Sequence, residues 1–419
     1  MTDAWSVDQH LDAVLASVRP LDPIDLPLLD AAGCVLVEDV LVPAPLPPFD
    51  NSAMDGYAVR VADVESASEE FPAHLTVAGE VAAGGAELPT VFPGQAVRVM
   101  TGAPLPPGAQ AVVPVEWTDG GAGGGPATAM TPAREQWVRV FRPAAEGAHV
   151  RTRGSDAPAG AVALPAGAVL GPPQLGLLAA VGRSTVPVTP RPRVVVLSTG
   201  SELAPPGEPL GPGQIHDSNS YMLTAAARQA GADAYRTAAV ADEPETFRAA
   251  LEDQLSRADL VVTTGGVSVG AHDVVKEALR GEVDFRRLAM QPGKPQGFGL
   301  LGAARTPLFA LPGNPVSAYV SFELFVRPAL RLMAGHAGGA LHRPRALACL
   351  ASDAPLPSPA GKRQYLRGSF SPGEGTVSPV GGSGSHLVAA LARADALIEV
   401  PEHVTEVAPG SELTVVLLG

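Results

Sequence analysis

The stretch from Arg191 to Leu330 constrains the fold of this chain more than any other part of the sequence. Short apolar runs of strand length alternate there with longer runs of helical periodicity. Strands are expected at Val194–Leu197, Ala234–Val240, Leu260–Thr263, Val283–Leu288 and Leu308–Leu311, and helices at Tyr221–Gln229, Glu245–Ser256, Val274–Leu279 and Val316–Leu332. Such alternation is typical of a parallel sheet covered by helices on both faces. The sequence therefore predicts a doubly wound α/β domain.

Two further regions carry β-like patterns. Turns rich in Gly and Pro separate short strands between Leu75 and Arg142, and the tail from Ala346 to Leu418 has a similar pattern. Each region indicates a small β domain. The proline-dense segment Leu41–Pro48 is expected to be an extended connector, and Ser6–Val18 has helical spacing behind a possible Ser6 cap. A chain of 419 residues is also too long for one core.

The charge of the chain excludes some classes of partner. The formal net charge is −14, and only Lys276, Lys294 and Lys362 are lysines. No stretch supplies the basic face that nucleic-acid binding needs, so no nucleic-acid partner is expected. No apolar run is long enough to span a membrane. An anionic ligand would need helix N-termini, backbone N–H groups, a few arginines or a metal ion.

The cysteines and the N-terminus bear on the compartment. Cys34 and Cys349 lie far apart in apolar surroundings, which predicts buried thiols in a reducing compartment rather than a disulfide framework. The segment from Met1 to His10 is polar and acidic and lacks the pattern of a secretory signal. We therefore expect a soluble, cytoplasmic protein.

Three of the predicted strands end in loops that suit a phosphorylated ligand. The carboxyl ends of parallel strands share one edge, where ligands of open α/β sheets bind. Glycines let the backbone approach a ligand, helix N-termini favour anions, and hydroxyls add donors. The alternative is that these loops are only tight turns. The expected substrate-binding residues are Ser198, Thr199, Gly200, Thr264, Gly265, Gly266, Ser268, Gly270, Pro312, Gly313, Asn314 and Ser317.

Acidic residues follow the same strands. Glu202, Asp242 and Asp273 each come just after a predicted strand end, so they are expected on the same rim. Carboxylates beside a phosphate site are typical of Mg²⁺, which takes oxygen ligands. In the alternative interpretation, Asp273 is a helix N-cap and Asp242 caps the helix that begins near Glu245.

Two acidic motifs lie outside this domain. Phe49–Tyr57 reads FDNSAMDGY, and Arg151–Asp156 reads RTRGSD. Neither follows an amphipathic period, so core packing alone does not explain them. Asx-turns at a domain junction use the same residue types and remain an alternative.

These motifs together resemble one family. The chain is similar to the molybdopterin molybdenumtransferases, the MoeA family, which also occurs as the C-terminal part of gephyrin. The matching segments are Pro48–Arg60, Val97–Glu116, Arg151–Gly160, Ser198–Leu203, Gly213–Leu223, Thr263–Asp273, Pro292–Gly299 and Leu311–Ala318, in family order. They cover nearly the whole chain.

The resemblance implies a multidomain α/β plus β fold and an elongated homodimer. A doubly wound parallel-sheet domain would bind molybdopterin, and small β domains would include a C-terminal one like a β-barrel. The implied divisions are an N-terminal helix (1–19) packed on the dimer or linker region, a linker or dimerisation domain (20–48 and 144–172), a small β domain (49–143), the molybdopterin-binding domain (173–332) and a C-terminal β domain (333–419).

The resemblance also implies a reaction and its residues. Molybdenum from molybdate would enter adenylated molybdopterin with release of AMP, in a reaction that depends on Mg²⁺. The implied catalytic residues are Asp55, Thr101, Asp156, Glu202, Asp242 and Asp273, with Glu202 and Asp242 as metal ligands. Further substrate-binding positions are Lys294, Arg367 and Ser385. Asp55 and Thr101 would face the α/β domain of the partner subunit.

One strand departs from the family pattern. Where relatives carry lysines, this chain has Arg287 and Gln291, and Lys294 is the lysine nearby. Arg keeps the positive charge with a different geometry, and Gln removes it. Lys294 either compensates for that loss or belongs to a purely structural turn.

Two alternative functions and several partners are also considered. A molybdopterin adenylyltransferase would share the α/β domain, but it does not need Asp55 and Thr101. A non-catalytic scaffold of the same fold is the other alternative. Besides the homodimer and the small-molecule substrates, we expect transient contacts with the adenylyltransferase and with molybdoenzyme maturation proteins.

Overall fold

The computed structural model describes residues 4–85, 87–131, 136–267 and 273–419. The chain forms two compact units, each made of several segments. The first contains Met1–Val37, Gly167–Pro172 and Thr185–Gly419, and the second contains Glu38–Ala166 and Pro173–Ser184. Each unit is described by itself.

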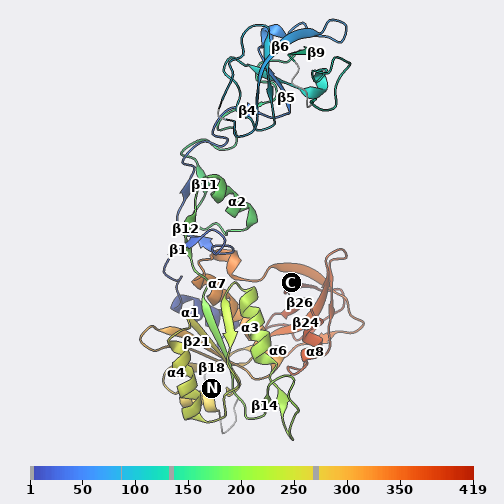
Figure 1. The fold of residues 1–419 in the computed structure, drawn as a ribbon. Helices are drawn as coiled ribbons and strands as arrows, with labels where there is room; N and C mark the ends of the chain where they lie inside the picture. The colour runs from blue at the N-terminus through green and yellow to red at the C-terminus, as the bar shows by residue number, and fades with distance from the viewer. Residues whose placement is uncertain (1–3, 86, 132–135, 268–272) are drawn as a thin grey trace. The chain divides into compact units, whose positions relative to one another are not determined.

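A six-stranded sheet organises the first unit (Figure 1). Its order is β16-β13-β17-β21-β20-β18, and the first four strands run parallel. The strands are β16 (Asp233–Arg236), β13 (Arg193–Ser198), β17 (Leu260–Thr264), β21 (Thr306–Leu311), β20 (Pro295–Leu301) and β18 (Val283–Arg287). The predicted strand after Val283 is therefore present at the sheet edge.

The edge of this sheet differs from the parallel pattern expected from the sequence. β18 pairs antiparallel with β20, and β20 pairs antiparallel with β21. β20 was not predicted. The segment that joins β18 to β20 is too short for a crossover helix, so the chain must return antiparallel. The sheet is mixed, with a parallel centre that carries the predicted loops.

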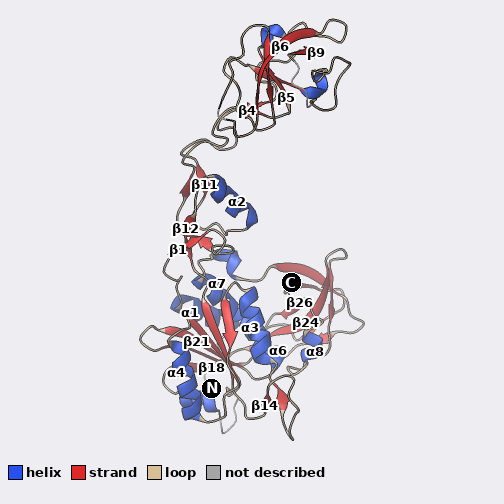
Figure 2. Ribbon diagram, in the orientation of Figure 1, coloured by secondary structure: helices blue, strands red, loops and turns tan. Residues whose placement is uncertain are grey.

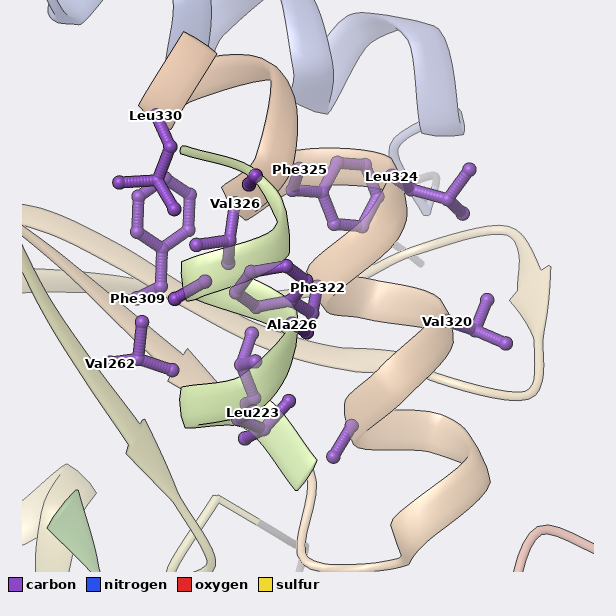
Figure 3. Close-up of a cluster of buried hydrophobic side chains, with 14 of the residues drawn as sticks. Leu223, Ala226, Val262, Phe309, Val320, Phe322, Leu324, Phe325, Val326 and Leu330 are labelled. Atoms are coloured by element: carbon purple, nitrogen blue, oxygen red, sulfur yellow. The ribbon is translucent and has the colours of Figure 1, made fainter. Parts of the chain in front are cut away.

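Helices cover both faces of the sheet, as the sequence predicted. α3 (Asn219–Gln229), α6 (Pro315–Ser321), the π-helical segment η3 (Phe322–Val326) and α7 (Arg327–Met333) contribute to the core on one face. Figure 3 shows Leu223 and Ala226 beside Phe322 in that core. α4 (Pro244–Leu255) and α5 (Val274–Ala278) pack in a second core on the other face. Within the described ranges, no helix is long and apolar enough to cross a membrane.

The N-terminal helix α1 (Val7–Ser17) begins at the predicted cap. The Ser6 Oγ accepts the Gln9 amide at 3.0 Å, and the Gln9 side chain accepts the Ser6 amide at 2.9 Å. Val7 and Val14 of α1 are buried in the core that contains α7. The apolar stripe of this helix packs on the α/β domain, where α7 and η3 offer a matching apolar surface.

A closed barrel of five strands forms the C-terminal part of the first unit (Figure 2). It consists of β24 (Arg363–Ser371), β25 (Thr376–Pro379), β22 (Arg345–Leu350), β28 (Glu412–Leu417) and β26 (Ala396–Val400). The predicted barrel-like C-terminal domain is confirmed. The short strand β19 (Met290–Gln291), between β18 and β20 in the chain, adds to β24 in parallel. A strand from the β18–β20 connection thus joins the sheet of the barrel.

The cysteine prediction holds for one thiol only. Cys34 is buried, whereas Cys349 is exposed. Cys349 lies in β22 between the buried Ala348 and Leu350. Because successive side chains of a strand point to opposite faces, Cys349 points away from the barrel core.

The first unit also holds a small three-stranded sheet. It consists of β1 (Ile24–Pro27), β12 (Thr185–Thr189) and β2 (Val35–Leu36), with β12 in the middle. The chain leaves this unit after Val37.

The second unit contains the predicted small β domain. Its five-stranded sheet has the order β8-β5-β7-β6-β9. The strands are β8 (Ala111–Pro114), β5 (Gly56–Val59), β7 (Gln95–Val99), β6 (Ala73–Val81) and β9 (Trp137–Val140). β5, which sequence reasoning missed, directly follows the FDNSAMD motif. The unit also holds the pairs β4 (Asn51–Ser52) with β10 (Val150–Arg151) and β3 (Val40–Leu41) with β11 (Val162–Leu164), and most of α2 (Pro172–Ala180).

Candidate functional site

The three predicted ligand loops lie side by side at one edge of the sheet. They follow β13, β17 and β21, which are consecutive and parallel. The Thr199 amide donates to the Thr264 carbonyl at 3.0 Å, and the Gly265 amide donates to the Leu311 carbonyl at 3.2 Å. The loops therefore begin in register, as expected for the carboxyl edge of a parallel sheet.

The glycines of the middle loop are required by the fold itself. Gly265 has φ +97°, and a Cβ there would lie 2.5 Å from the Thr199 carbonyl oxygen. Gly266 has φ +63°, and its Cβ would lie 2.8 Å from Val275. These contacts bear out the tight-turn interpretation for both glycines. Any ligand contact of this loop must come from its backbone and polar groups. The predicted residues Ser268 and Gly270 lie outside the described residues.

Asn219 connects the second and third loops to α3. Its Nδ2 donates to Thr264 Oγ1 at 3.0 Å and to the Gly313 carbonyl at 2.7 Å. Thr264 Oγ1 in turn donates to the Pro312 carbonyl at 3.1 Å. Sequence reasoning did not select Asn219. The sequence feature that could have indicated Asn219 is the string HDSN (residues 216–219), which leads directly into an apolar helix.

Asp217 has the corresponding role for the first loop. Its carboxylate is buried and accepts Ser198 Oγ at 3.1 Å, the Ser220 amide at 3.1 Å and Ser220 Oγ at 2.6 Å. The predicted binding residue Ser198 is therefore hydrogen-bonded to Asp217.

The other predicted binding residues differ in exposure. Ser317 is buried, while Gly313 and Asn314 are exposed. Thr199 is buried, and its Oγ1 has no hydrogen-bond partner among the described protein atoms.

The two predicted metal ligands lie on loops that are tied together. Asp242 Oδ2 accepts the Ser201 amide at 3.0 Å, and the Asp242 amide lies 3.5 Å from Ser201 Oγ. Glu202 is the next residue, and both carboxylates are exposed. A Cβ at Gly200 would lie 2.5 Å from Glu202 Oε2, so glycine leaves room for that carboxylate. Asp242 does not cap α4, whose N-cap is Glu243.

No group of three or more His, Cys, Asp or Glu side chains suited to a metal ion occurs within the described ranges. Two carboxylates on adjacent loops are hard oxygen donors, the type that Mg²⁺ prefers. Magnesium is usually held in proteins by one or two carboxylates together with substrate phosphates and water. The donor set of Glu202 and Asp242 fits that pattern.

Asp273 stands at the N-cap position of α5, but its side chain makes no capping hydrogen bond. Its carboxylate lies 3.0 Å from Lys276 Nζ in an ion pair and is largely buried. From the sequence, Asp273 is predicted to be a carboxylate on the ligand rim or, in the alternative interpretation, a helix N-cap. Because Lys276 follows at helical spacing of three residues, the two side chains meet on one face of the helix.

Ser385 of the barrel domain contacts the third loop. Asn314 Nδ2 donates to Ser385 Oγ at 2.9 Å, and the Val316 amide donates to the Ser385 carbonyl at 3.0 Å. Arg367 is almost fully buried, and burial lowers the pKa of its guanidinium. It donates to the carbonyls of Gly382 and Gly384. Arg367 therefore braces the loop that presents Ser385.

The residues that depart from the family pattern lie near the barrel. Gln291 belongs to β19 and stands opposite Gln364 of the barrel. Arg287 is exposed at the end of β18, and Lys294 is half-buried. The Lys294 carbonyl accepts the Leu288 amide at 2.8 Å, which closes the turn between the strands. The substituted residues thus flank the junction between the two domains of the first unit.

In the second unit, Asp55 and Thr101 are in contact. Asp55 Oδ1 accepts the Thr101 amide at 2.6 Å and Thr101 Oγ1 at 2.9 Å, and both residues are exposed. Asp156 is exposed as well, and its amide donates to the Leu46 carbonyl at 3.0 Å. The Asx-turn interpretation does not account for the carboxylate of Asp55, because its partner is distant in the chain.

Comparison with known proteins agrees with this architecture. Residues 5–182 match the MoeA N-terminal region (domain I and II), residues 195–332 a probable molybdopterin-binding domain, and residues 350–418 the MoeA C-terminal region (domain IV). A protein of Mycobacterium tuberculosis named molybdopterin molybdenumtransferase 2 is 47% identical over 98% of both chains. This chain belongs to the MoeA family.

Other MoeA relatives support the same assignment. A Bacillus subtilis molybdopterin molybdenumtransferase is 36% identical over 89% of this chain and 85% of its own. The crystal structure of a molybdopterin biosynthesis MoeA protein from Pyrococcus horikosii superposes with a TM-score of 0.79 at 32% identity and covers 100% of both chains. The MoeA fold predicted from the motifs is therefore confirmed. All three ligand loops fall in the molybdopterin-binding region.

Proposed function

We propose that this chain is a molybdopterin molybdenumtransferase, an enzyme of molybdenum cofactor biosynthesis. The observation that carries the proposal is the convergence of three ligand loops and two exposed carboxylates at one sheet edge in a member of the MoeA family. The proposed substrates are molybdate and adenylated molybdopterin, and the proposed products are molybdenum-loaded molybdopterin and AMP.

The three loops are proposed to hold the phosphate groups of the pterin substrate. The third loop leads into α6, which continues through η3 and α7 as one long helical run. The N-terminus of such a run favours an anion, and Asn314 and Gly313 are exposed there. Asn219 and Asp217 would keep the loops in place during binding, because each bridges α3 to a strand end.

Glu202 and Asp242 are proposed to hold Mg²⁺ together with substrate oxygens. When bound, the ion would neutralise phosphate charge that the two carboxylates would otherwise repel. The Ser201 amide holds Asp242 in place, and Gly200 leaves space for Glu202. Attack of a water or molybdate oxygen on phosphorus would break the pyrophosphate-type bond and release AMP.

Asp273 is proposed to position the substrate or accept a proton. Asp273 Oδ2 lies 3.0 Å from Lys276 Nζ, and its carboxylate oxygens are hydrogen-bond acceptors. Ser385 is proposed to contact molybdate beside the third loop, while Arg367 holds its loop. Gln291 stands where relatives carry a lysine. Lys294 is proposed to supply the positive charge that is missing at that position.

The function is tested by measuring AMP release from adenylated molybdopterin with Mg²⁺ and molybdate. Glu202→Gln and Asp242→Asn keep the shape of the side chains but remove one charge each. We expect each variant to lose activity by roughly a hundredfold, the scale of removing one electrostatic partner of a transition state. Asp253→Asn is the matched control, because Asp253 is an exposed acid on α4 that pairs with Arg257.

Two results would contradict the proposal. If Glu202→Gln and Asp242→Asn both released AMP at the wild-type rate, Glu202 and Asp242 could not be the metal ligands of the reaction. Adenylation of free molybdopterin with ATP by the wild-type chain, without release of AMP, would favour the adenylyltransferase alternative. The matches to MoeA regions on both sides of the molybdopterin-binding region favour the transferase.

A further inference from the structure

His149, in the second unit, has an unusual backbone conformation. Among the described residues, His149 and Arg305 are the two non-glycine residues with positive φ. His149 has φ +54° and directly precedes β10. A left-handed backbone is costly for a residue with a side chain, and strain of this kind is often found at functional sites. The contacts of His149 show what the strained conformation supports.

The backbone of His149 holds the loop that carries Asp55. The His149 carbonyl accepts the Ala53 amide at 2.9 Å. Two residues further along the same loop, the Asp55 carbonyl accepts the Val115 amide at 3.0 Å. Val115 is the first residue of the short helix η2 (Val115–Trp117). Two segments that are distant from the loop in the chain therefore hold it in place.

The side chains of these two segments are in contact with each other. Trp117 is the last residue of η2, and its ring meets the His149 ring edge to face, with centroids 5.3 Å apart and an interplanar angle of 79°. Edge-to-face packing is one of the favoured arrangements of aromatic rings. Trp117 also packs against a core of the five-stranded sheet. The Trp117–His149 ring pair therefore links both segments that hold the Asp55 loop, and it is anchored on the sheet.

The Asp55–Thr101 pair depends on the position of this loop. Ser52, in the same loop, donates its amide to the Ala103 carbonyl at 3.0 Å and accepts the Gly102 amide at 2.8 Å. The Asp55 carboxylate accepts both the amide and the hydroxyl of Thr101. A shift of the loop would therefore disturb the carboxylate and its threonine together. A displacement of about 1 Å can lower a reaction rate by about a hundredfold.

We propose that the Trp117–His149 ring pair is a positioning element for the Asp55–Thr101 pair in the transfer reaction. This inference rests on the proposed function, in which Asp55 and Thr101 are candidate catalytic residues. The ring pair acts through the loop and not on the substrate. The left-handed backbone of His149 directs its carbonyl to Ala53 and its ring to Trp117 at the same time.

The first test compares two substitutions of His149 in the full-length chain. Asparagine tolerates a left-handed backbone, so His149→Asn removes the ring and keeps the carbonyl in place. We expect kcat for AMP release to fall about tenfold. KM should change little, because the predicted substrate-binding loops belong to the first unit.

His149→Phe restores a ring beside Trp117 and tests the contact itself. Phenylalanine tolerates the left-handed backbone less well, so we expect a lower melting temperature together with kcat close to that of the wild type. An unchanged kcat in His149→Asn would overturn the proposal. Equal losses of kcat in His149→Asn and His149→Phe would also overturn it, because the ring contact would then have no part.

His74→Asn is the matched control. His74 on β6 also contacts a tryptophan of the second unit, Trp137 on β9, with ring centroids 6.2 Å apart. This variant should keep the wild-type kcat. A double variant gives a further check: if the ring pair acts only through Asp55, adding His149→Asn to Asp55→Asn should cause no further loss. A further tenfold loss would give His149 a separate role and contradict the proposal.

Hydrogen exchange separates this inference from the proposed function. The Thr101 amide donates to Asp55 Oδ1 at 2.6 Å, so its protection factor reports the geometry of the pair without any substrate. His149→Asn should lower this protection factor, and His74→Asn should not. If the wild type releases AMP and His149→Asn keeps both kcat and the Thr101 protection, the inference fails while the function stands. If the wild type releases no AMP, the function fails, and unchanged Thr101 protection in His149→Asn would still overturn the positioning of the pair.

Discussion

At the scale of single residues, Asn219 has the largest structural influence on the candidate site. One amide group holds the ends of the second and third loops, and its Oδ1 has no hydrogen-bond partner among the described protein atoms. The amide is therefore placed to keep the two loops together. Removing it leaves the Gly313 carbonyl and the buried Thr264 hydroxyl without this donor.

We predict that Asn219→Ala lowers kcat/KM for adenylated molybdopterin by tenfold or more, because loops that move by about 1 Å lose catalytic alignment. The free energy of unfolding should fall by about 1–3 kcal/mol, as for other buried groups left unsatisfied. Steady-state kinetics and thermal unfolding measure the two effects.

Ser218→Ala is the control for Asn219→Ala. Ser218 precedes Asn219 at the start of α3, and its side chain makes no capping hydrogen bond. It should retain wild-type kinetics. If Asn219→Ala also retained them, the bridge between the loops would have no part in the reaction.

At the scale of elements, α1 shows how a distant segment joins the α/β domain. His10 of α1 is buried, and its ring meets the Phe325 ring edge to face with centroids 4.7 Å apart. Burial is the main cause that lowers the pKa of His10 from 6.5 to about 4. The nearby Arg286 lowers it further, and Asp284 opposes that effect. The packing of α1 therefore requires a neutral imidazole.

We predict that the attachment of α1 weakens in mild acid. The folded pKa lies below the unfolded one, so the unfolded chain binds more protons and stability falls as pH drops from 6.5 towards 4. Between pH 7 and pH 5 the loss from His10 is about 2 kcal/mol. Protection factors of the α1 amides, obtained from hydrogen exchange at both pH values, measure it.

His10→Leu is the comparison variant for that experiment. It removes the titrating group but keeps an apolar contact with Phe325, so the protection factors of the α1 amides, which are corrected for intrinsic exchange, should depend much less on pH. His336, whose pKa burial also lowers to about 4, still titrates in this variant and serves as an internal reference. A pH response of α1 identical to that of the wild type would show that His10 does not control it.

At the scale of the whole molecule, the candidate catalytic residues are divided between the two compact units. Glu202, Asp242 and Asp273 belong to the first unit, and Asp55, Thr101 and Asp156 belong to the second. The proposed homodimer would let the Asp55–Thr101 pair of one copy complete the site of another. Symmetric pairs of this kind are the commonest soluble assemblies.

We predict that two inactive variants restore activity when they form mixed dimers. Asp55→Asn and Glu202→Gln, unfolded and refolded together, should give one intact site in each mixed dimer. About a quarter of the wild-type sites should then be active, because half of the dimers are mixed and each has one intact site of two. AMP release by the mixture is the measurement. No recovery, with mixed dimers verified by mass, would mean that each site forms within one chain.

Much of the fold of this protein can be predicted from its local sequence. The strands and helices around the parallel sheet, the Ser6–Gln9 cap and the position of the three loops are set by apolar periodicity and by side chains a few residues apart. The motif order was likewise enough to recognise the MoeA fold. These features need no knowledge of distant contacts.

Other features were decided only by the tertiary structure, because they depend on pairing between distant or competing groups. The antiparallel return of β20, the addition of β19 to the barrel and the exposure of Cys349 depend on register. The bridge made by Asn219 joins residues far apart in the chain. Periodicity shows which residues are apolar and where loops begin. Only folding determines which polar atoms meet across those loops, and this decides the arrangement of the candidate site.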